Sequence, residues 1–520
     1  MTGSHIYLTA TIPYVNAKPH LGHALEFVQA DVLARHYRRL GELVRFQTGT
    51  DDNSLKNVLA AEAAGVGVRE LVDANAAAFE ALAGPLSLSV DDVIRTSSDP
   101  RHRVGVERLW LACADAGDLY RNCYEGLYCV GCEAFYTESE LDGGLCPEHG
   151  VPPQLVAEEN WFFRLSRYAG RLRDEIAAGR LRIEPAGRRN EVLAFIEAGL
   201  ADFSVSRSTA RAHGWGIPVP GDQGQVIYVW FDALANYLTA LGYGTGQSEL
   251  NRWWAGAERR IHVLGKGVLR FHAVYWPAIL FSAGLPVPTD ILVHDYLTLE
   301  GRRISKSGGN TVDPAGLVAD YGTDAVRWWL LREVPRIGDA DFTRERLIAR
   351  ANDELANGIG NLVSRVLALV GRHSDPMVPV GKRPPPGAEA LAAARRLAPE
   401  QVDAALAVGD FRLATAAVWA IAAQANRFIS QARPWRLADA ERGGDGQAGR
   451  HLDAVLAYLV GTCLDLADQL RPFLPDAAER ITRRCGDRGG LISGAQPLFA
   501  RLPSAPDPRQ PLARAAEADP

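Results

Sequence analysis

The sequence lacks several features that would assign it to other classes of protein. No apolar run among its 520 residues reaches the length of about 18 that a membrane-spanning helix requires. Residues 1–13 contain no basic segment followed by an apolar block, so a secretory signal is not indicated. Internal repeats are also missing. We therefore expect a cytoplasmic protein with no membrane partner.

Charge and cysteine content are equally limited. The 56 Lys and Arg nearly balance the 62 Asp and Glu, which leaves a net charge of −6. This argues against a protein that coats nucleic acid, although a local basic face could still bind one. Seven cysteines are too few and of the wrong parity for a disulfide framework, and three of them fall between 129 and 146. In a reducing compartment such clustering suggests a metal.

What is present is the composition of a globular enzyme, with 47% apolar and 23% charged residues. Residues 6–10 form a β-rich run, residues 21–40 repeat apolar side chains at helical spacing, and another strand begins at 44. A second block contains predicted strands at 226–230, 261–264 and 291–293. This alternation predicts an α/β fold with a Rossmann-like, doubly wound parallel sheet.

A chain of this length should hold about two to four domains. Aromatic and Gly-rich short elements interrupt the α/β pattern, and an Ala- and Leu-rich pattern with helical spacing follows it, which predicts an all-α bundle. The predicted parts are the first half of the α/β domain at 1–115, an insertion at 116–225, the second half of the α/β domain at 226–300, a loop region at 301–350, the bundle at 351–500 and a disordered tail at 501–520.

Two separated motifs suggest a phosphate site. His20-Leu21-Gly22-His23 lies where a strand gives way to a helix, and the N–H groups there attract phosphate. Gly22 allows close approach of a nucleotide, and the two imidazoles can donate hydrogen bonds to phosphate oxygens. A distant loop, 301–309, carries Lys306 among Gly and Ser residues. Taken singly, a surface turn and a basic loop explain the two motifs better than a site does.

Together the two motifs resemble the His-Ile-Gly-His and Lys-Met-Ser-Lys-Ser signatures of class I aminoacyl-tRNA synthetases. Other segments resemble the methionyl members of that family over about residues 5–440. They are Ile12-Pro13-Tyr14-Val15-Asn16, Thr48-Gly49-Thr50-Asp51, Tyr228-Val229-Trp230-Phe231-Asp232-Ala233 and Phe271-His272-Ala273-Val274-Tyr275-Trp276-Pro277-Ala278.

The resemblance implies formation of methionyl-adenylate from methionine and ATP, followed by transfer of the methionyl group to tRNA(Met). It also implies that 1–115 and 226–300 together form the catalytic half, that 301–350 holds the signature loop and contacts the tRNA stem, and that 351–500 binds the anticodon. It assigns catalytic roles to His20, His23 and Lys306, with Mg²⁺ accompanying the ATP. The residues expected to contact ATP are Gly22, Lys266, Asp295, Ser305 and Ser307. Those expected around the amino acid are Ile12, Tyr14, Asp51, Trp230, Ala233, Tyr237, Val268 and His272.

Chemistry supports the amino-acid assignments. Asp51 can pair with the α-ammonium group, because a buried cation needs an anion. Trp230 and Tyr237 offer a flat apolar wall for a thioether. Tyr14 and His272 can offer polar hydrogens to the sulfur. Any single aromatic residue here could equally be ordinary core packing.

A metal site is predicted from cysteine spacing. Cys129-x2-Cys132 and Cys146-x2-His149 are separated by thirteen residues and can close a tetrahedral shell around Zn²⁺. The arrangement also resembles the zinc knuckle of methionyl enzymes, and four protein ligands indicate a structural role. The remaining cysteines, Cys113, Cys123, Cys463 and Cys485, lack such spacing and are predicted to be buried thiols.

The bundle carries residues that match the family's anticodon-reading positions. Asn361 and Arg365 lie one helical turn apart, and Trp435 could stack on an unpaired base. An ordinary polar helix surface is the alternative. We expect the protein to be a monomer.

Three positions depart from the family pattern. Asn53 replaces a histidine, Gly267 replaces an aspartate, and Asp295 replaces a glycine. We expect Asp295 to supply the carboxylate lost at position 267, since both positions should follow strands that end beside the nucleotide. The changes indicate a divergent copy.

Two other functions compete with tRNA charging. An enzyme of this type could activate an amino acid for a small non-tRNA acceptor, which the altered nucleotide site would favour and the anticodon residues would not. A non-catalytic tRNA-binding module would have no need of His20, His23 and Lys306.

Overall fold

A computed structural model describes residues 3–129, 134–147, 150–304, 311–373, 381, 383–486 and 497–503. Its centre is a six-stranded parallel sheet in the order β3-β2-β1-β12-β13-β7. The strands are β1 (His5–Ala10), β2 (Leu43–Thr50), β3 (Asp92–Arg95), β7 (Arg182–Glu184), β12 (Arg259–Gly265) and β13 (Asp290–His294). The predicted doubly wound α/β sheet is therefore confirmed.

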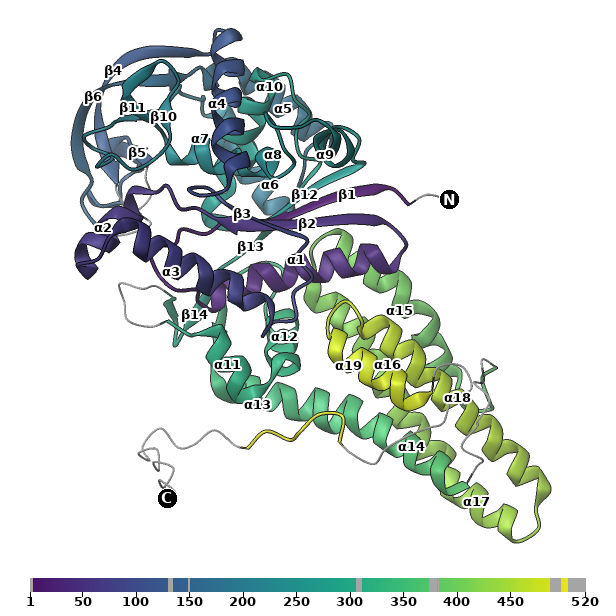
Figure 1. The fold of residues 1–520 in the computed structure, drawn as a ribbon. Helices are drawn as coiled ribbons and strands as arrows, with labels where there is room; N and C mark the ends of the chain where they lie inside the picture. Colours follow the sequence, from purple (N-terminus) through teal and green to yellow (C-terminus); the bar gives the residue numbers. More distant parts are fainter. Residues whose placement is uncertain are drawn as a thin grey trace, which may run out of the picture.

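The central strands are apolar on both faces because both faces are covered. In β1, Ile6 and Leu8 belong to a core shared with α1 (Leu21–Arg39) and the C-terminal bundle. Tyr7 points into a second core, formed with α4 (Pro100–Asp115) and α10 (Trp276–Ser282). Figure 1 shows α1 below the sheet and α4, α7 (Val229–Leu234), α8 (Asn236–Thr239) and α10 above it.

The chain up to residue 300 contains further helices. They are α2 (Leu55–Ala64), α3 (Val68–Glu80), α5 (Ala169–Ala177), α6 (Ala186–Glu197), α7 (Val229–Leu234), α8 (Asn236–Thr239) and α9 (Ser248–Leu250). One predicted strand is wrong. Only Val226 and Ile227 of the run 226–230 are in a strand, and Val229 and Trp230 begin α7.

The region predicted as an insertion forms its own antiparallel sheet. Its order is β5 (Ala134–Tyr136), β4 (Leu119–Cys129), β6 (Gln154–Phe163) and β8 (Phe203–Ser204). A smaller sheet joins β10 (Pro218–Val219), β11 (Asp222–Ile227) and β9 (Ser206–Ser208). The same stretch of chain also supplies β7, which pairs with β13 at the edge of the central sheet.

After β13 the chain crosses to the bundle through β14 (Leu297–Leu299), β15 (Arg302–Arg303) and β16 (Ala340–Phe342). The helices of the C-terminal part are α11 (Pro314–Tyr321), α12 (Thr323–Arg332), α13 (Arg344–Arg350), α14 (Asn361–His373), α15 (Glu389–Ala407), α16 (Phe411–Ala432), α17 (Pro434–Arg442), α18 (Gly446–Leu470) and α19 (Pro475–Cys485). The predicted helical bundle is confirmed. The predicted disordered tail falls almost wholly outside the described residues.

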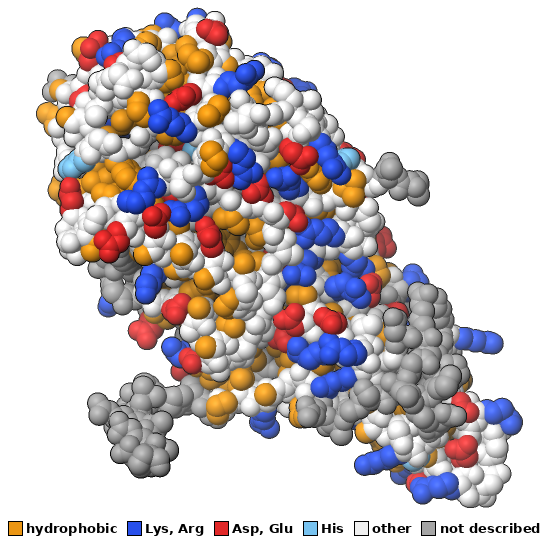
Figure 2. Space-filling view, in the orientation of Figure 1, with side chains coloured by type: hydrophobic (Ala, Val, Ile, Leu, Met, Phe, Trp, Pro, Cys, Tyr) orange, Lys and Arg blue, Asp and Glu red, His pale blue; other side chains and the backbone are white. Residues whose placement is uncertain are grey.

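No helix in the described ranges is long and apolar enough to span a bilayer. The face shown in Figure 2 carries Lys and Arg interspersed with Asp and Glu over the catalytic half. This mixture agrees with the small net charge of −6.

One buried ion pair joins the bundle to the catalytic half. Arg327 on α12 and Asp31 on α1 lie 2.8 Å apart, and both side chains are fully buried. Arg327 also donates hydrogen bonds to the carbonyl oxygens of Leu86, Pro472 and Phe473. Burial alone would raise the pKa of the Asp31 carboxyl, but the attraction of Arg327 and Arg35 holds that pKa below its usual value.

Replacing Asp31 by Asn should therefore destabilise the protein strongly, because it leaves the Arg327 cation buried without its anion. We expect the free energy of unfolding, measured by urea denaturation, to fall by about 3–5 kcal/mol. The matched control is Arg103→Ala, which removes an exposed pair with Glu107 at 2.8 Å and should cost less than about 1 kcal/mol. Similar losses in the two variants would contradict this account.

Candidate active site

A large cavity opens at the carboxyl ends of β1, β12 and β13. Its volume is about 780 Å³. Helices follow β1 and β12 on opposite faces of the sheet, so the cavity lies where a doubly wound sheet binds nucleotides. All eight residues predicted around the amino acid line it, together with His20, Gly22, His23, Lys266 and Asp295 from the other predictions.

The two histidines of the first motif cap the start of α1. The Nδ1 of His20 accepts a hydrogen bond from the N–H of Gly22, and the Nδ1 of His23 accepts one from the N–H of His20, each at 3.1 Å. A neutral ring that accepts at Nδ1 carries its proton on Nε2. Both imidazoles can therefore donate from Nε2.

Packing keeps these rings in place. They stack with centroids 3.8 Å apart. Burial, reinforced by the nearby His20, lowers the pKa of His23 well below its usual value, so the ring stays neutral at pH 7. A Cβ on residue 22 would lie 2.9 Å from the His20 ring. Glycine at this position therefore allows the ring to cover the end of the helix.

The predicted amino-acid residues form a second, more apolar part of the cavity. Trp230 stacks on Phe271 at 3.7 Å and meets Tyr14 edge-on at 6.2 Å. Asp51 is 3% exposed, and one of its carboxylate oxygens accepts a hydrogen bond from the backbone N–H of Asn53. An apolar wall therefore faces a buried carboxylate, which suits an amino acid with an apolar side chain.

The expected role of His272 needs correction. Its Nδ1 lies 2.9 Å from the carbonyl oxygen of Val268, which can only accept, so Nδ1 carries the proton. Its Nε2 then accepts from the hydroxyl of Tyr237 at 2.8 Å. Burial lowers the pKa of His272 to about 4, so the ring stays neutral. In this arrangement His272 has no polar hydrogen left to offer to a ligand.

The part of the cavity that follows Gly265 is filled by protein side chains to a greater extent than the sequence suggests. A Cβ on residue 267 would lie 2.2 Å from the hydroxyl oxygen of Tyr296, so the tyrosine fills that space. Asp295 is 4% exposed, accepts from the N–H of Gly338 at 2.6 Å and pairs with Arg188. Its carboxylate lines the cavity yet is already bonded to protein donors. Its role toward the nucleotide stays a prediction.

Lys266 is similarly engaged. Its ammonium nitrogen lies 2.6 Å from an oxygen of Asp339 and 3.8 Å from one of Asp295. It also lies 4.5 Å from the centroid of the Tyr296 ring. Lys266 can therefore turn toward a nucleotide only by exchanging these contacts.

The sequence analysis missed several residues of the cavity. Glu26 accepts from the N–H and the hydroxyl of Thr11 and from the N–H of Gly265. Its position three residues after His23, on the same helix face, could have revealed it. Glu140 and Tyr136 reach the cavity from the insertion, and Lys56 lies over the Tyr14 ring at 4.2 Å. No local pattern marks these contacts.

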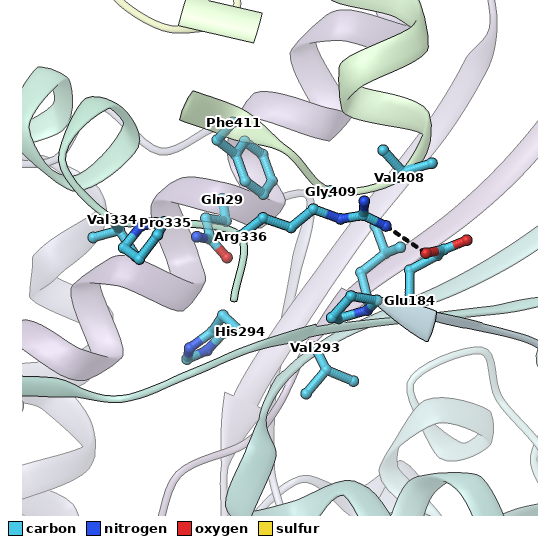
Figure 3. A pocket seen from close by; sticks show the side chains of 12 residues that line it. Gln29, Glu184, Val293, His294, Val334, Pro335, Arg336, Val408, Gly409 and Phe411 are labelled. Carbon is cyan, nitrogen blue, oxygen red and sulfur yellow. Dashed lines mark hydrogen bonds and ion pairs between the residues drawn. The ribbon is translucent and has the colours of Figure 1, made fainter. Parts of the chain in front are cut away.

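His294 connects the cavity to a second, smaller one under the sheet. This second cavity, of about 20 Å³, lies between β13, α1 and the segment that precedes α16. Figure 3 shows Gln29 and Phe411 on its walls and the ion pair between Arg336 and Glu184, whose atoms lie 2.6 Å apart. The Nε2 of His294 lies 3.3 Å from Glu26. His294 therefore lines both cavities.

The second signature and half of the metal site cannot be placed. Ser305, Lys306 and Ser307 lie outside the described residues, as do Cys132 and His149. Cys129, at the end of β4, and Cys146 are both buried. No group of metal-binding side chains forms among the residues that the structure describes. The zinc site stays a prediction.

The other four cysteines differ in burial. Cys113, Cys463 and Cys485 are buried, as predicted. Cys123 is exposed, which contradicts the prediction. It lies in β4 of the insertion, within the exposed stretch 121–123.

The predicted anticodon residues lie on two helices that touch each other, α14 and α17. Asn361 is exposed at the start of α14, and Arg365 follows on the same face. Trp435 is 42% exposed, which is unusual for so large an apolar side chain. Exposed Arg433 and Arg436 flank it, and Lys and Arg side chains project from this end of the bundle in Figure 2. Such a surface suits single-stranded bases.

Comparison with known proteins agrees with this geometry. The family model described as tRNA synthetases class I (M) matches residues 6–154 and 149–367. The methionine--tRNA ligase of Brucella suis is 40% identical over 492 residues, which cover 92% of each chain. That of Rhizobium meliloti is 39% identical over 97% of this chain and 98% of its own. A structure of Mycobacterium tuberculosis methionyl-tRNA synthetase in complex with methionyl-adenylate superposes with a TM-score of 0.88 and 37% identity, covering 96% of this chain and 100% of that one.

These matches extend over the catalytic half, the insertion and the bundle. The chain is a class I aminoacyl-tRNA synthetase by fold and site. Within that class it belongs to the methionine--tRNA ligase family.

The contact between Gly267 and Tyr296 gives a test of this part of the cavity. Gly267→Ala should lower the free energy of unfolding by about 1–3 kcal/mol, because its methyl group meets the Tyr296 hydroxyl. In a Tyr296→Phe background the nearest ring carbon lies 3.4 Å away, and the same alanine should cost little. Thermal unfolding of the unmodified chain, the two single variants and the double variant completes this double-mutant cycle. Equal losses in both backgrounds would mean that Tyr296 does not fill this space.

Proposed function

We propose that this chain activates L-methionine with ATP and transfers the methionyl group to tRNA(Met). The observation that carries the proposal is the single cavity of about 780 Å³ that holds both the capped start of α1 and the aromatic wall around Trp230. Relatives whose alignments with this chain cover 92–98% of both sequences, at 39–40% identity, are methionine--tRNA ligases. The similarity includes the bundle, which favours tRNA over a small acceptor.

In the proposed reaction the carboxylate of methionine attacks the α-phosphorus of ATP, and pyrophosphate leaves. The Nε2–H groups of His20 and His23 would stabilise the charge that grows on the phosphate oxygens. Lys306 would do the same for the departing pyrophosphate, with ATP entering as its Mg²⁺ complex. Asp51 would hold the α-ammonium group in line. Catalysis would then rest on orientation and electrostatics.

The bundle would position the acceptor. Asn361, Arg365 and Trp435 would read the anticodon by hydrogen bonds and stacking on bases that are not paired. We also propose a cytoplasmic monomer, since residues of one chain complete the cavity. Sedimentation would test the oligomeric state.

Amino-acid-dependent pyrophosphate exchange over the twenty amino acids tests the proposal. We expect exchange with methionine, and charging of initiator and elongator tRNA(Met) when they are added. His23→Ala should lower the exchange rate about 10²–10³-fold, as expected for losing one donor to the transition state. His451→Ala is the control and should keep full activity, because His451 is a half-buried residue of α18 that does not line the cavity. Exchange without charging would support a different acceptor. The absence of both exchange and charging would support a non-catalytic binding module.

We further propose that Cys129, Cys132, Cys146 and His149 hold one structural Zn²⁺ in the insertion. Two of these residues, Cys129 at the end of β4 and Cys146, are buried cysteines. Four protein ligands would leave no open position, so the metal would fix the insertion rather than take part in the chemistry.

Metal analysis of the purified protein tests this site. We expect about one zinc per chain, and its loss in Cys146→Ala, because three ligands bind zinc far more weakly than four. Cys113→Ala removes a buried thiol that lies near the carbonyl oxygen of Ile279 and should keep the zinc. Equal zinc contents in the two variants, or none in the unmodified chain, would reject the site.

A further inference from the structure

A buried polar network lies directly behind the wall of the amino-acid pocket. Asp232 is 1% exposed and belongs to α7, between Trp230 and Ala233 of the cavity. One of its oxygens lies 2.5 Å from Nε2 of His102, and the other accepts from the side-chain amide of Asn53 at 2.7 Å. His102 is fully buried, and its Nδ1 lies 2.8 Å from the hydroxyl of Thr239.

Asn53 is the member of this network that reaches both halves of the pocket. Its side-chain amide also donates to the carbonyl oxygen of Thr96 at 3.3 Å. Its backbone N–H donates to a carboxylate oxygen of Asp51 at 3.3 Å. The same residue therefore holds the loop that carries Asp51 and the helix that carries Trp230.

The helix needs such an anchor. It spans only six residues, Val229–Leu234, and no side chain caps its start. A helix this short has little stability of its own. The buried carboxylate of Asp232 must be satisfied by hydrogen bonds, because an unpaired charge away from water is costly. The bonds from Asn53 and His102 therefore fix the position of α7.

The surroundings leave room for a larger group at this position. A cavity of about 30 Å³ adjoins Asn53 and is lined by Trp215, Tyr228 and Arg207. A histidine, the residue of the family pattern, could extend into it and still present a ring N–H to Asp232. Asn53 keeps an N–H donor to Asp232 but lacks the imidazole ring.

We propose that Asn53 is a positioning residue for the amino-acid pocket, acting through Asp232 on the Trp230 wall and through its backbone on Asp51. The inference rests on the proposed function, since it takes methionine as the ligand. Asn53 lies behind the pocket wall, so its loss should affect the amino acid and spare the nucleotide.

Steady-state pyrophosphate exchange and calorimetric binding of methionine test the inference. Asn53→Ala should raise KM for methionine and weaken methionine binding by roughly tenfold or more, the effect of removing a donor to a buried charge. KM for ATP should change less than about threefold. Asn53→His should stay within about threefold of the unmodified chain in both constants, because it restores the donor. Asn122→Ala, at an exposed position in β4, is the control for loss of an asparagine.

Thermal unfolding of each variant separates positioning from stability. A lower melting temperature in Asn53→Ala with unchanged KM for methionine would overturn the inference. So would equal rises in both KM values, or a His variant as impaired as the Ala variant. If the unmodified chain bound no methionine, the proposed function would fail first, and a different amino acid in the exchange assay would identify the correct ligand.

Discussion

The arrangement of the molecule depends on the buried ion pair between Arg327 and Asp31. Two charges without solvent contact are stable only when each remaining hydrogen-bonding position is filled. Arg327 meets this condition with carbonyl oxygens from the 86–89 loop and from the segment before α19. The helix that carries Asp31, α1, has His20 and His23 at its start. A single helix, α1, thus connects the phosphate end of the site to the bundle.

Much of this could be predicted from the sequence, because the signals are local. Helical spacing located α1 within one residue of its end, and the buried strands β1, β12 and β13 followed from their apolar runs. The eight residues that the family resemblance places around methionine all line one cavity.

The remainder arises from contacts between distant segments. The apolar run at 226–230 has strand character, yet its second half belongs to α7, whose Asp232 contacts His102, 130 residues away. His272 lies in a π-helical turn, Phe271–Tyr275, and its Nδ1–H donates to the carbonyl oxygen of Val268. Glu140 approaches the cavity only because the insertion folds back over it. The side chain of Tyr296 takes the space beside Gly267. From the sequence we expect Asp295 to replace the carboxylate that is lost at position 267.

The central claim is that one cavity forms methionyl-adenylate and passes its acyl group to tRNA. Rapid quenching of the purified chain with methionine and α-labelled ATP, in the absence of tRNA, tests it most directly. The account predicts a burst of about one enzyme-bound methionyl-adenylate per chain, which disappears as methionyl-tRNA appears when tRNA(Met) is added. An adenylate formed with another amino acid, or one that tRNA(Met) does not discharge, would contradict it.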